Sequence, residues 1–361
     1  FINQSMLFYW GIYFTQINLG GFEQGIIFAI YPMVGILSVL PTGLFNDRVH
    51  SKNLIFAGFT LIAVQFFGIL FTQNFFVLCG IFTLGSIGAM LSKLSIDSFF
   101  YKNSNRDKSK EVGTYVGTYL FGAGLGTLTG GFILNYVPFE SLFIGVGIMA
   151  LLMAFTSQLL PKNQVFHFEL EAYQKDLLKP EILMFMLMIF LWAIHMGAEV
   201  SSYGLYLRED LGLEYQEMAI YMGSAIMGMY FWSKYASHRL SEKTPAIQIV
   251  YWGLFLSGAG LLVMTSNTLQ LSYLGRLIHE GGDAFMFVFL YHGVRRLFPA
   301  NRVGGSAGVT HFAQMSAITM SSLLFAPLGK IYGNAYPFIV GGIFILIALP
   351  IAYRFAHLIK H

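Results

Sequence analysis

The chain has 361 residues, of which 56% are hydrophobic and only 11% are charged. Soluble domains carry about 25% charged residues, so this chain has too few charges to cover a water-facing surface of its size. Its net charge of +3 is too small to indicate nucleic-acid binding, and its single cysteine, Cys79, excludes an intrachain disulfide. The composition therefore predicts a chain whose outer surface faces lipid, and the spans described next make the predicted class an all-α membrane protein.

The apolar stretches of the chain are long enough to be membrane spans, since a helix needs about 20 apolar residues to cross a bilayer. Glycine, proline, asparagine and charged residues separate twelve such stretches. They are residues 1–17, 24–45, 54–72, 75–100, 112–134, 139–160, 181–206, 217–236, 245–265, 270–294, 303–329 and 336–357. The first is short and begins with Phe1 rather than Met, which we interpret as a missing natural N-terminus.

The polar stretch 161–180 divides these spans into two pseudo-symmetric six-helix lobes, residues 1–160 and 181–361. Basic residues support this topology, because cytoplasmic loops are enriched in Lys and Arg. If the first span runs outward, most of the 21 basic residues fall on one side of the membrane. We therefore predict that both termini are cytoplasmic, with the protein in a bacterial inner membrane. Two six-helix halves are typical of secondary transporters.

The turn after the second span carries a recognisable motif. It reads Gly-Leu-Phe-Asn-Asp-Arg-Val-His-Ser-Lys from Gly43 to Lys52. This turn resembles the signature of the major facilitator superfamily in Gly43, Asp47, Arg48 and Lys52, whereas His50 replaces the usual second glycine. The resemblance implies a twelve-helix fold that works by alternating access. It also implies that Gly43 permits close helix approach and that the charged residues latch a gate.

Two further resemblances point to opposite directions of transport. Glycines of the fifth span (Gly113, Gly122, Gly126 and Gly130-Gly131) resemble the glycine motif of the superfamily's proton-linked antiporters. Those glycines are equally explained by close helix packing. Residues 20–25 and 31–32 instead look like the start of the lactose-permease and nucleoside-symporter branch, which favours uptake.

Ionisable residues inside predicted spans indicate function, because each is costly in lipid. They are Lys93, Asp97, Glu199, Arg276, Glu280 and Asp283. All lie on the fourth, seventh and tenth spans, which line the central cavity in the family that the chain resembles. The first span, which also lines that cavity, contributes the uncharged Gln4 and Gln16.

The seventh and tenth spans each carry a polar face. Offsets of i, i+3, i+4 and i+7 place side chains on one face of a helix. On the tenth span these are Arg276, His279, Glu280 and Asp283, and on the seventh span the corresponding face holds Trp192, His195, Glu199 and Tyr203. We predict that the two faces meet. The three carboxylates are the expected proton-binding groups, tuned by His195 and His279. The alternative is a static ion pair between Arg276 and Glu280.

The remaining polar residues of the spans suggest substrate contacts and a gate. Lys93 and Arg276 beside several acids suit a small polar, anionic or zwitterionic organic solute. Trp192, Tyr203 and His311 are further substrate-binding candidates, although Trp192 and His311 are also explained by packing. For Asp97, the resemblance implies a role in the gate.

We thus expect a monomeric, proton-coupled solute carrier that is not an enzyme and holds no cofactor or resident metal. Sodium is an alternative coupling ion at the same carboxylates. An efflux antiporter and a carrier of a divalent metal ion or metal chelate are alternative functions. The last is suggested by the nitrogen and oxygen ligands of His195, Glu199, His279, Glu280 and Asp283.

Overall fold

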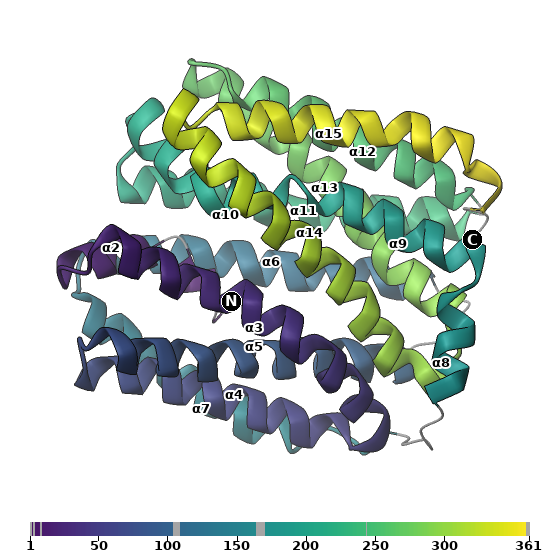
Figure 1. Ribbon diagram of the computed structural model, residues 1–361, viewed down its shortest axis with the longest axis horizontal. Coiled ribbons are helices and arrows are strands. Elements are labelled where there is room, and N and C mark those ends of the chain that lie inside the picture. The colour runs from purple at the N-terminus through teal and green to yellow at the C-terminus, as the bar shows by residue number, and fades with distance from the viewer. Residues whose placement is uncertain are drawn as a thin grey trace. The chain divides into compact units, whose positions relative to one another are not determined.

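The computed structural model describes residues 2, 4–7, 9–103, 109–163, 170–242 and 244–358, and its regular elements there are all helices. In chain order (Figure 1) they are α1 (Gln4–Leu7), α2 (Trp10–Gln16), α3 (Gly21–Arg48), α4 (Ser51–Gly68), η1 (Ile69–Phe71), α5 (Phe75–Asn103), α6 (Ser109–Leu134), α7 (Phe139–Ser157), α8 (Leu170–Leu177), α9 (Pro180–Ala193), α10 (Met196–Leu205), η2 (Tyr206–Asp210), α11 (Tyr215–Ser241), α12 (Ala246–Met264), α13 (Leu269–Leu297), η3 (Ala300–Arg302), α14 (Val303–Tyr332), α15 (Tyr336–Arg354) and η4 (Ala356–Leu358).

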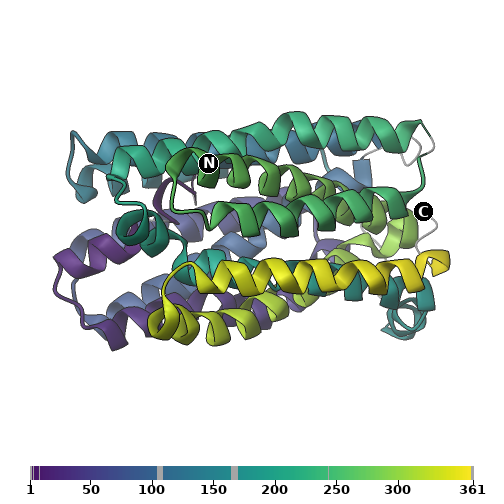
Figure 2. The same ribbon diagram turned by 90° about the horizontal axis from the view of Figure 1, so that it is seen from above.

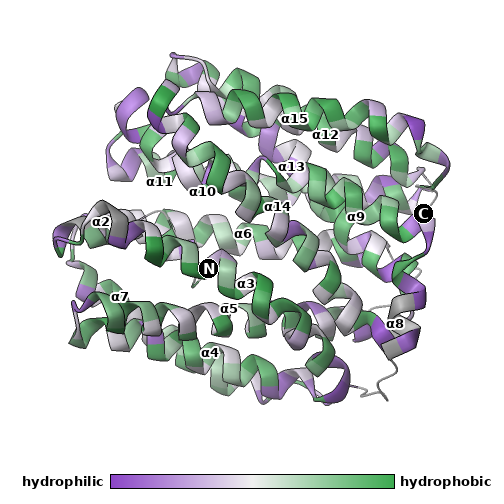
Figure 3. Cartoon of the chain, in the orientation of Figure 1, coloured by the Kyte–Doolittle hydropathy of each residue, from purple (hydrophilic) through white to green (hydrophobic). Residues whose placement is uncertain are grey.

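The predicted all-helical membrane class is confirmed. Within the described ranges, nine helical segments are long and apolar enough to cross a membrane. Figure 3 shows hydrophobic residues along the middle of the long helices and hydrophilic residues at many of their ends and connections. The predicted eighth and tenth spans correspond to α11 and α13, of 27 and 29 residues, which are long enough but more polar. The predicted first span contains the short helices α1 and α2. A total of twelve spans stays a prediction.

Local sequence signals explain where several helices begin. Glu23 accepts a hydrogen bond from the backbone N–H of Gly20 at 2.8 Å, and Glu217 does the same for Glu214 at 2.8 Å. Each carboxylate thereby caps the start of its helix, α3 and α11 respectively. Pro180 occupies the first turn of α9, where its missing N–H costs nothing.

The predicted seventh span is a helical segment, Pro180–Asp210, with an irregular turn inside it. α9 ends at Ala193 and α10 begins at Met196, with Ile194 and His195 in a turn between them. Broken helices are tolerated at membrane depth where the backbone is buried in protein or lines an aqueous cavity. The break places a titratable side chain at the point where the helix is interrupted.

The chain forms two compact units, each described by itself. The first contains Phe1–Asn103, Thr129–Tyr173 and Pro299–Phe312. In it α4 packs between α5 and α7, and α3 packs on α5 (Figure 1). Trp10 lies in its aromatic core, with its ring centroid 5.5 Å from that of Phe143 and 5.7 Å from that of Phe66.

The second unit contains Ser104–Leu128, Gln174–Phe298 and Ala313–His361. In it α12 packs between α13 and α15, α11 packs on α13, and α9 contacts α13 and α15 (Figure 1 and Figure 2). α13 is the central helix of this unit, because most of its residues after Gly275 are buried. Its polar residues are therefore positioned by neighbouring helices on several sides.

Candidate functional site

Six ionisable side chains come together in the second unit, and we call them the ion cluster. They are His195, Glu199, Arg276, His279, Glu280 and Asp283. The last four lie on one face of α13, whereas Glu199 belongs to the first turn of α10 and His195 to the turn before it. The polar faces predicted for the seventh and tenth spans are therefore in contact.

Arg276 bridges two carboxylates. Its guanidinium forms ion pairs with Glu199 of α10 and with Glu280 of its own helix, and it lies over the ring of Tyr203 at 4.5 Å from the centroid. A cation above an aromatic face is attracted by the ring quadrupole. The side chains of Arg276 and Glu280 are 4% and 5% exposed, whereas that of Glu199 is 21% exposed. The Arg276–Glu280 pair is thus present, but it is one half of a bridge between α10 and α13.

Asp283 is held by donors from three directions. Its Oδ1 accepts hydrogen bonds from the indole N–H of Trp192 at 2.9 Å and from the hydroxyl of Ser257 at 2.6 Å. Its Oδ2 lies 3.1 Å from Nε2 of His195 and 3.7 Å from Nε2 of His279. Because the carboxylate is buried, these contacts fix both its position and its orientation.

Backbone carbonyls fix both imidazole rings. Nδ1 of His195 donates to the carbonyl of Trp192, and Nδ1 of His279 donates to the carbonyl of Ser257 at 2.9 Å. A carbonyl only accepts hydrogen bonds, so Nδ1 carries a proton in both rings. Nε2 of His195 can then donate to Oδ2 of Asp283, or bind an ion once it has lost its proton. Both Nε2 atoms therefore face Asp283, and Nε2 of His279 also lies 3.3 Å from Oε1 of Glu199.

Ser257 is a member of this site that sequence reasoning missed. It lies on α12 in an apolar stretch with no charged neighbour, so no sequence signal identifies it. The approach of α12 to α13 depends on Gly282, where a Cβ atom would collide with the backbone nitrogen of Ser257. Trp192, predicted as a substrate-stacking residue, is fully buried, and its ring packs edge-on against Phe287 at 4.9 Å.

In the first unit, Asp47 of the signature motif caps the start of α14. Its carboxylate accepts backbone N–H groups of Gly304 at 3.1 Å and Gly305 at 2.8 Å, and Nζ of Lys102 lies 3.4 Å away. A carboxylate at a helix N-terminus is favoured by the unpaired N–H groups and the helix dipole. Close approach of α3 to α14 requires Gly43, since a Cβ there would lie 2.8 Å from the carbonyl oxygen of Gly304.

A second charged group of the same unit surrounds Asp97. Both of its carboxylate oxygens accept hydrogen bonds from Nζ of Lys93, at 2.8 and 2.7 Å, and Oδ2 lies 3.0 Å from Nε2 of His311. Asp97 is completely buried, whereas the side chain of Lys93 is 25% exposed. His311, predicted as a substrate-binding or packing residue, thus pairs with a residue predicted for the gate.

The end of the signature motif contacts residues that follow α7. Nδ1 of His50 donates to the backbone carbonyl of Asn163 at 2.9 Å, and the side chain of Asn163 accepts the N–H of Ser51 at 2.7 Å. Nζ of Lys52 donates to the carbonyl of Gln158 at 3.3 Å. The histidine that replaces the usual glycine therefore has a contact of its own. Arg48 is exposed at the end of α3.

The other predicted residues lie apart from the ion cluster and from the contacts of Asp47 and Asp97. Gln4 is half-buried on α1, and Gln16 is exposed at the end of α2. Among the fifth-span glycines, the N–H of Gly113 donates to the hydroxyl of Ser237 on α11 at 3.0 Å, which is a packing contact.

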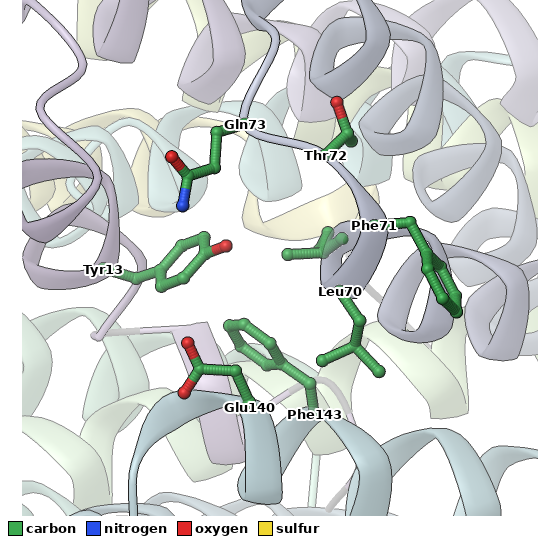
Figure 4. Close-up of a pocket in the computed structure, with 8 residues that line it drawn as sticks. Tyr13, Leu70, Phe71, Thr72, Gln73, Glu140 and Phe143 are labelled. Carbon is green, nitrogen blue, oxygen red and sulfur yellow. The ribbon is translucent and has the colours of Figure 1, made fainter.

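A cavity of about 400 Å³ lies elsewhere in the first unit, among residues that sequence reasoning did not select. Figure 4 shows the hydroxyl of Tyr13, the amide of Gln73 and the carboxylate of Glu140 around the same space. Phe143 and residues of η1 complete its wall.

Long apolar helices that carry buried ion clusters define an integral membrane protein. A sequence profile of the Major Facilitator Superfamily matches residues 1–250. The chain belongs to this superfamily of transporters, so the resemblance seen in the signature motif is confirmed. The resemblances to particular branches stay predictions.

Relatives and solved structures agree with this family. The chain is 30% identical over 142 residues to the methyl viologen resistance protein SmvA of Salmonella typhimurium, which is 38% of this chain and 28% of that protein. It therefore matches less than a third of that relative's length. The fold is similar to that of the human organic anion transporter MFSD10 (TM-score 0.73, 16% identity, 94% of this chain and 88% of that chain). It is equally similar to that of a bacterial homologue of the iron transporter ferroportin in its outward-facing state (TM-score 0.73, 15% identity, 99% and 97%).

Proposed function

We propose that the protein is a secondary active transporter that moves a small polar, anionic or zwitterionic organic solute by alternating access. In this proposal twelve spans form two six-helix lobes, residues 1–160 and 181–361, joined by the cytoplasmic linker 161–180. Residues 164–169 of that linker lie outside the described part of the chain. The protein works as a monomer in a bacterial inner membrane, with both termini cytoplasmic.

The observation that carries the proposal is the bridge from Arg276 to Glu199 and Glu280. One guanidinium serves two carboxylates on two helices, so the charge state of either carboxylate changes how strongly α10 and α13 attract each other. Protonation of one carboxylate weakens its half of the bridge and lets the other half dominate. Such a change couples proton binding to the relative position of two helices, which is what a proton-driven carrier requires. Sodium at the same carboxylates is the alternative coupling ion.

Substrate contacts are proposed for side chains that combine charge with an aromatic or amide surface. Arg276 and Lys93 supply positive charge for an anionic group, and Tyr203 supplies an aromatic face that already holds Arg276. Trp192, His311, Gln4 and Gln16 complete the proposed set.

The proposed gate consists of Asp47 with the start of α14 and of Asp97 with His311. Both contacts join helices that lie far apart in the sequence, by charge-assisted hydrogen bonds. Alternating access requires such contacts to break and re-form in each cycle. Gly43, Arg48 and Lys52 belong to the same proposed gate.

The experiment is solute flux into proteoliposomes under an imposed pH gradient. Glu199→Gln, Glu280→Gln and Asp283→Asn are the test variants, and Glu181→Gln is the control because Glu181 is exposed at the start of α9. We expect the gradient to drive flux in the wild type and in the control but not in the test variants. Flux that ignores the gradient, and is unchanged in all three test variants, contradicts proton coupling.

Export is a second candidate function, favoured by the similarity to a protein named for methyl viologen resistance. The same proteoliposomes separate the two directions when the solute is loaded on either side. Growth of a sensitive bacterial strain in methyl viologen gives an independent test. Protection by the wild type but not by Asp283→Asn supports export.

A further inference from the structure

We infer that His195, His279 and Asp283 form a binding site for a divalent first-row transition-metal ion. One ring nitrogen of each histidine and a carboxylate oxygen of Asp283 all lie within 4.8 Å of one another, and all three residues are buried. The inference shares the ion cluster with the proposed function, but it concerns ion binding and not flux.

The distances between these atoms fit a coordination shell. Metal–nitrogen bonds of about 2.0–2.1 Å place two ligands of a tetrahedral ion about 3.4 Å apart. Oδ2 of Asp283 lies 3.1 Å from Nε2 of His195 and 3.7 Å from Nε2 of His279. These two separations lie on either side of the value expected for neighbouring ligands.

Both rings are oriented as metal-binding histidines are. Such histidines donate their other ring N–H to a carbonyl, a carboxylate or water, which fixes the tautomer and points the lone pair at the ion. His195 and His279 donate Nδ1–H to the carbonyls of Trp192 and Ser257. The ligating carboxylate is also held from behind, because Trp192 and Ser257 both donate to Oδ1 of Asp283 and leave Oδ2 facing the rings.

One ring nitrogen at this site lacks a hydrogen bond. Among the described residues, no hydrogen bond reaches Nε2 of His279, although the side chain is completely buried. A buried polar atom without a hydrogen bond is costly, and a metal ion bound at Nε2 would satisfy it. This atom is aimed at the space between Asp283 and Glu199.

The charge of the cluster also matches a divalent cation. Glu199, Glu280 and Asp283 contribute three negative charges when ionised, and Arg276 contributes one positive charge, so neutral rings leave an excess of two negative charges. Buried charge that lacks a counter-charge is strongly destabilising, and one divalent ion neutralises this excess.

The ligand types select the class of ion. Two imidazoles and one carboxylate suit Zn²⁺, Co²⁺, Ni²⁺ or Fe²⁺, whereas Mg²⁺ and Ca²⁺ prefer oxygen ligands. Three protein ligands leave coordination positions for water or for an anionic group of a solute.

The test is calorimetric titration of the tag-free, chelator-stripped protein in detergent with Zn²⁺, Co²⁺, Mg²⁺ and Ca²⁺. We expect one Zn²⁺ or Co²⁺ ion per chain and no heat from Mg²⁺ or Ca²⁺. His195→Gln and His279→Gln should each weaken binding at least tenfold. His238→Gln is the matched control, because His238 forms an exposed pair with Glu242 at 3.3 Å and should bind as the wild type does. Absence of Zn²⁺ binding, equal binding of Mg²⁺, or unchanged affinity in both site variants overturns the inference.

A second measurement covers variants that fail to fold. Co²⁺ bound by two imidazoles and a carboxylate gives visible absorption bands, which Zn²⁺ but not Mg²⁺ should displace from the wild-type protein. A featureless Co²⁺ spectrum overturns the inference without any variant. Neither readout uses a pH gradient. A failure of proton-linked flux in liposomes therefore does not contradict metal binding, and a failure of metal binding does not contradict proton-linked flux.

Discussion

Nε2 of His311 on α14 lies 3.0 Å from Oδ2 of Asp97 on α5, and Lys93 donates to both oxygens of the same carboxylate from one turn earlier. Asp97 has no exposed surface, so its charge depends on these two partners. His311 is therefore part of the electrostatic contact between α5 and α14, and its loss affects two helices that are remote in the sequence.

His311→Phe should lower the stability of the protein by about 2 kcal/mol, because it removes a hydrogen bond to a buried charge. Thermal unfolding in detergent measures the change. Thr310→Val is the matched control, since the hydroxyl of Thr310 bonds to the carbonyl of Ser306 in its own helix. Equal melting temperatures for the two variants would show that the contact with Asp97 does not contribute to stability.

Trp192→Phe should destabilise the second unit by about 1.5–3 kcal/mol, because the Oδ1 atom of Asp283 loses a charge-assisted donor. The phenylalanine ring should still pack in this position. The expected changes are therefore a lower stability and a weaker binding of the metal ion inferred for the ion cluster. Trp252→Phe on α12 serves as the control, as Trp252 is 56% exposed. The prediction fails if both tryptophan variants melt like the wild type.

Gly43→Val should separate α3 from the start of α14, since its side chain would occupy the space of the Gly304 carbonyl. Labelling of a cysteine introduced at Ala307, which is buried on α14, measures the separation in a Cys79→Ser background. Faster labelling is expected in Gly43→Val than in Gly25→Ala, because Gly25 of the same helix has no neighbour within 4 Å of a Cβ position. Identical labelling rates would argue against a close-packed gate.

His50→Gly restores the usual residue of the signature motif but removes the hydrogen bond to Asn163. We expect a loss of about 1 kcal/mol, and a comparable loss for Asn163→Ala, which keeps the backbone carbonyl bonded to His50 but removes the side-chain acceptor of the N–H of Ser51. The double variant should lose less than the sum of the two, as expected for residues in contact. Strictly additive losses in thermal unfolding would mean that the two residues act independently.

Helix periodicity predicted the charged face of α13 because the positions of Arg276, His279, Glu280 and Asp283 follow from helix geometry alone. The same reasoning predicted that α10 would meet this face. The pairing of Arg276 with both Glu199 and Glu280 could not be predicted, because it depends on the distance between α10 and α13. Residue spacing within one helix does not give that distance. The partnership of Asp97 with His311 was missed for the same reason, as the two residues are 214 positions apart.

Two features of the second unit had no signal in the sequence. Ser257 lies among apolar residues of α12, and only the packing at Gly282 brings its hydroxyl to Asp283. The interruption at Ile194 and His195 contains neither proline nor glycine, so an unbroken span was the natural prediction.

The turn between α9 and α10 allows two residues of the ion cluster, His195 and Glu199, to move by different amounts. His195 lies in the turn between the two helices, whereas Glu199 lies one turn beyond it on α10. A change of the angle between α9 and α10 would therefore move Glu199 farther than His195. Movement of α10 relative to α9 would lengthen the Glu199–Arg276 contact while the His195–Asp283 contact stays nearly fixed. The contacts of the cluster would then open in a fixed order. The Glu199–Arg276 ion pair would separate before the His195–Asp283 contact.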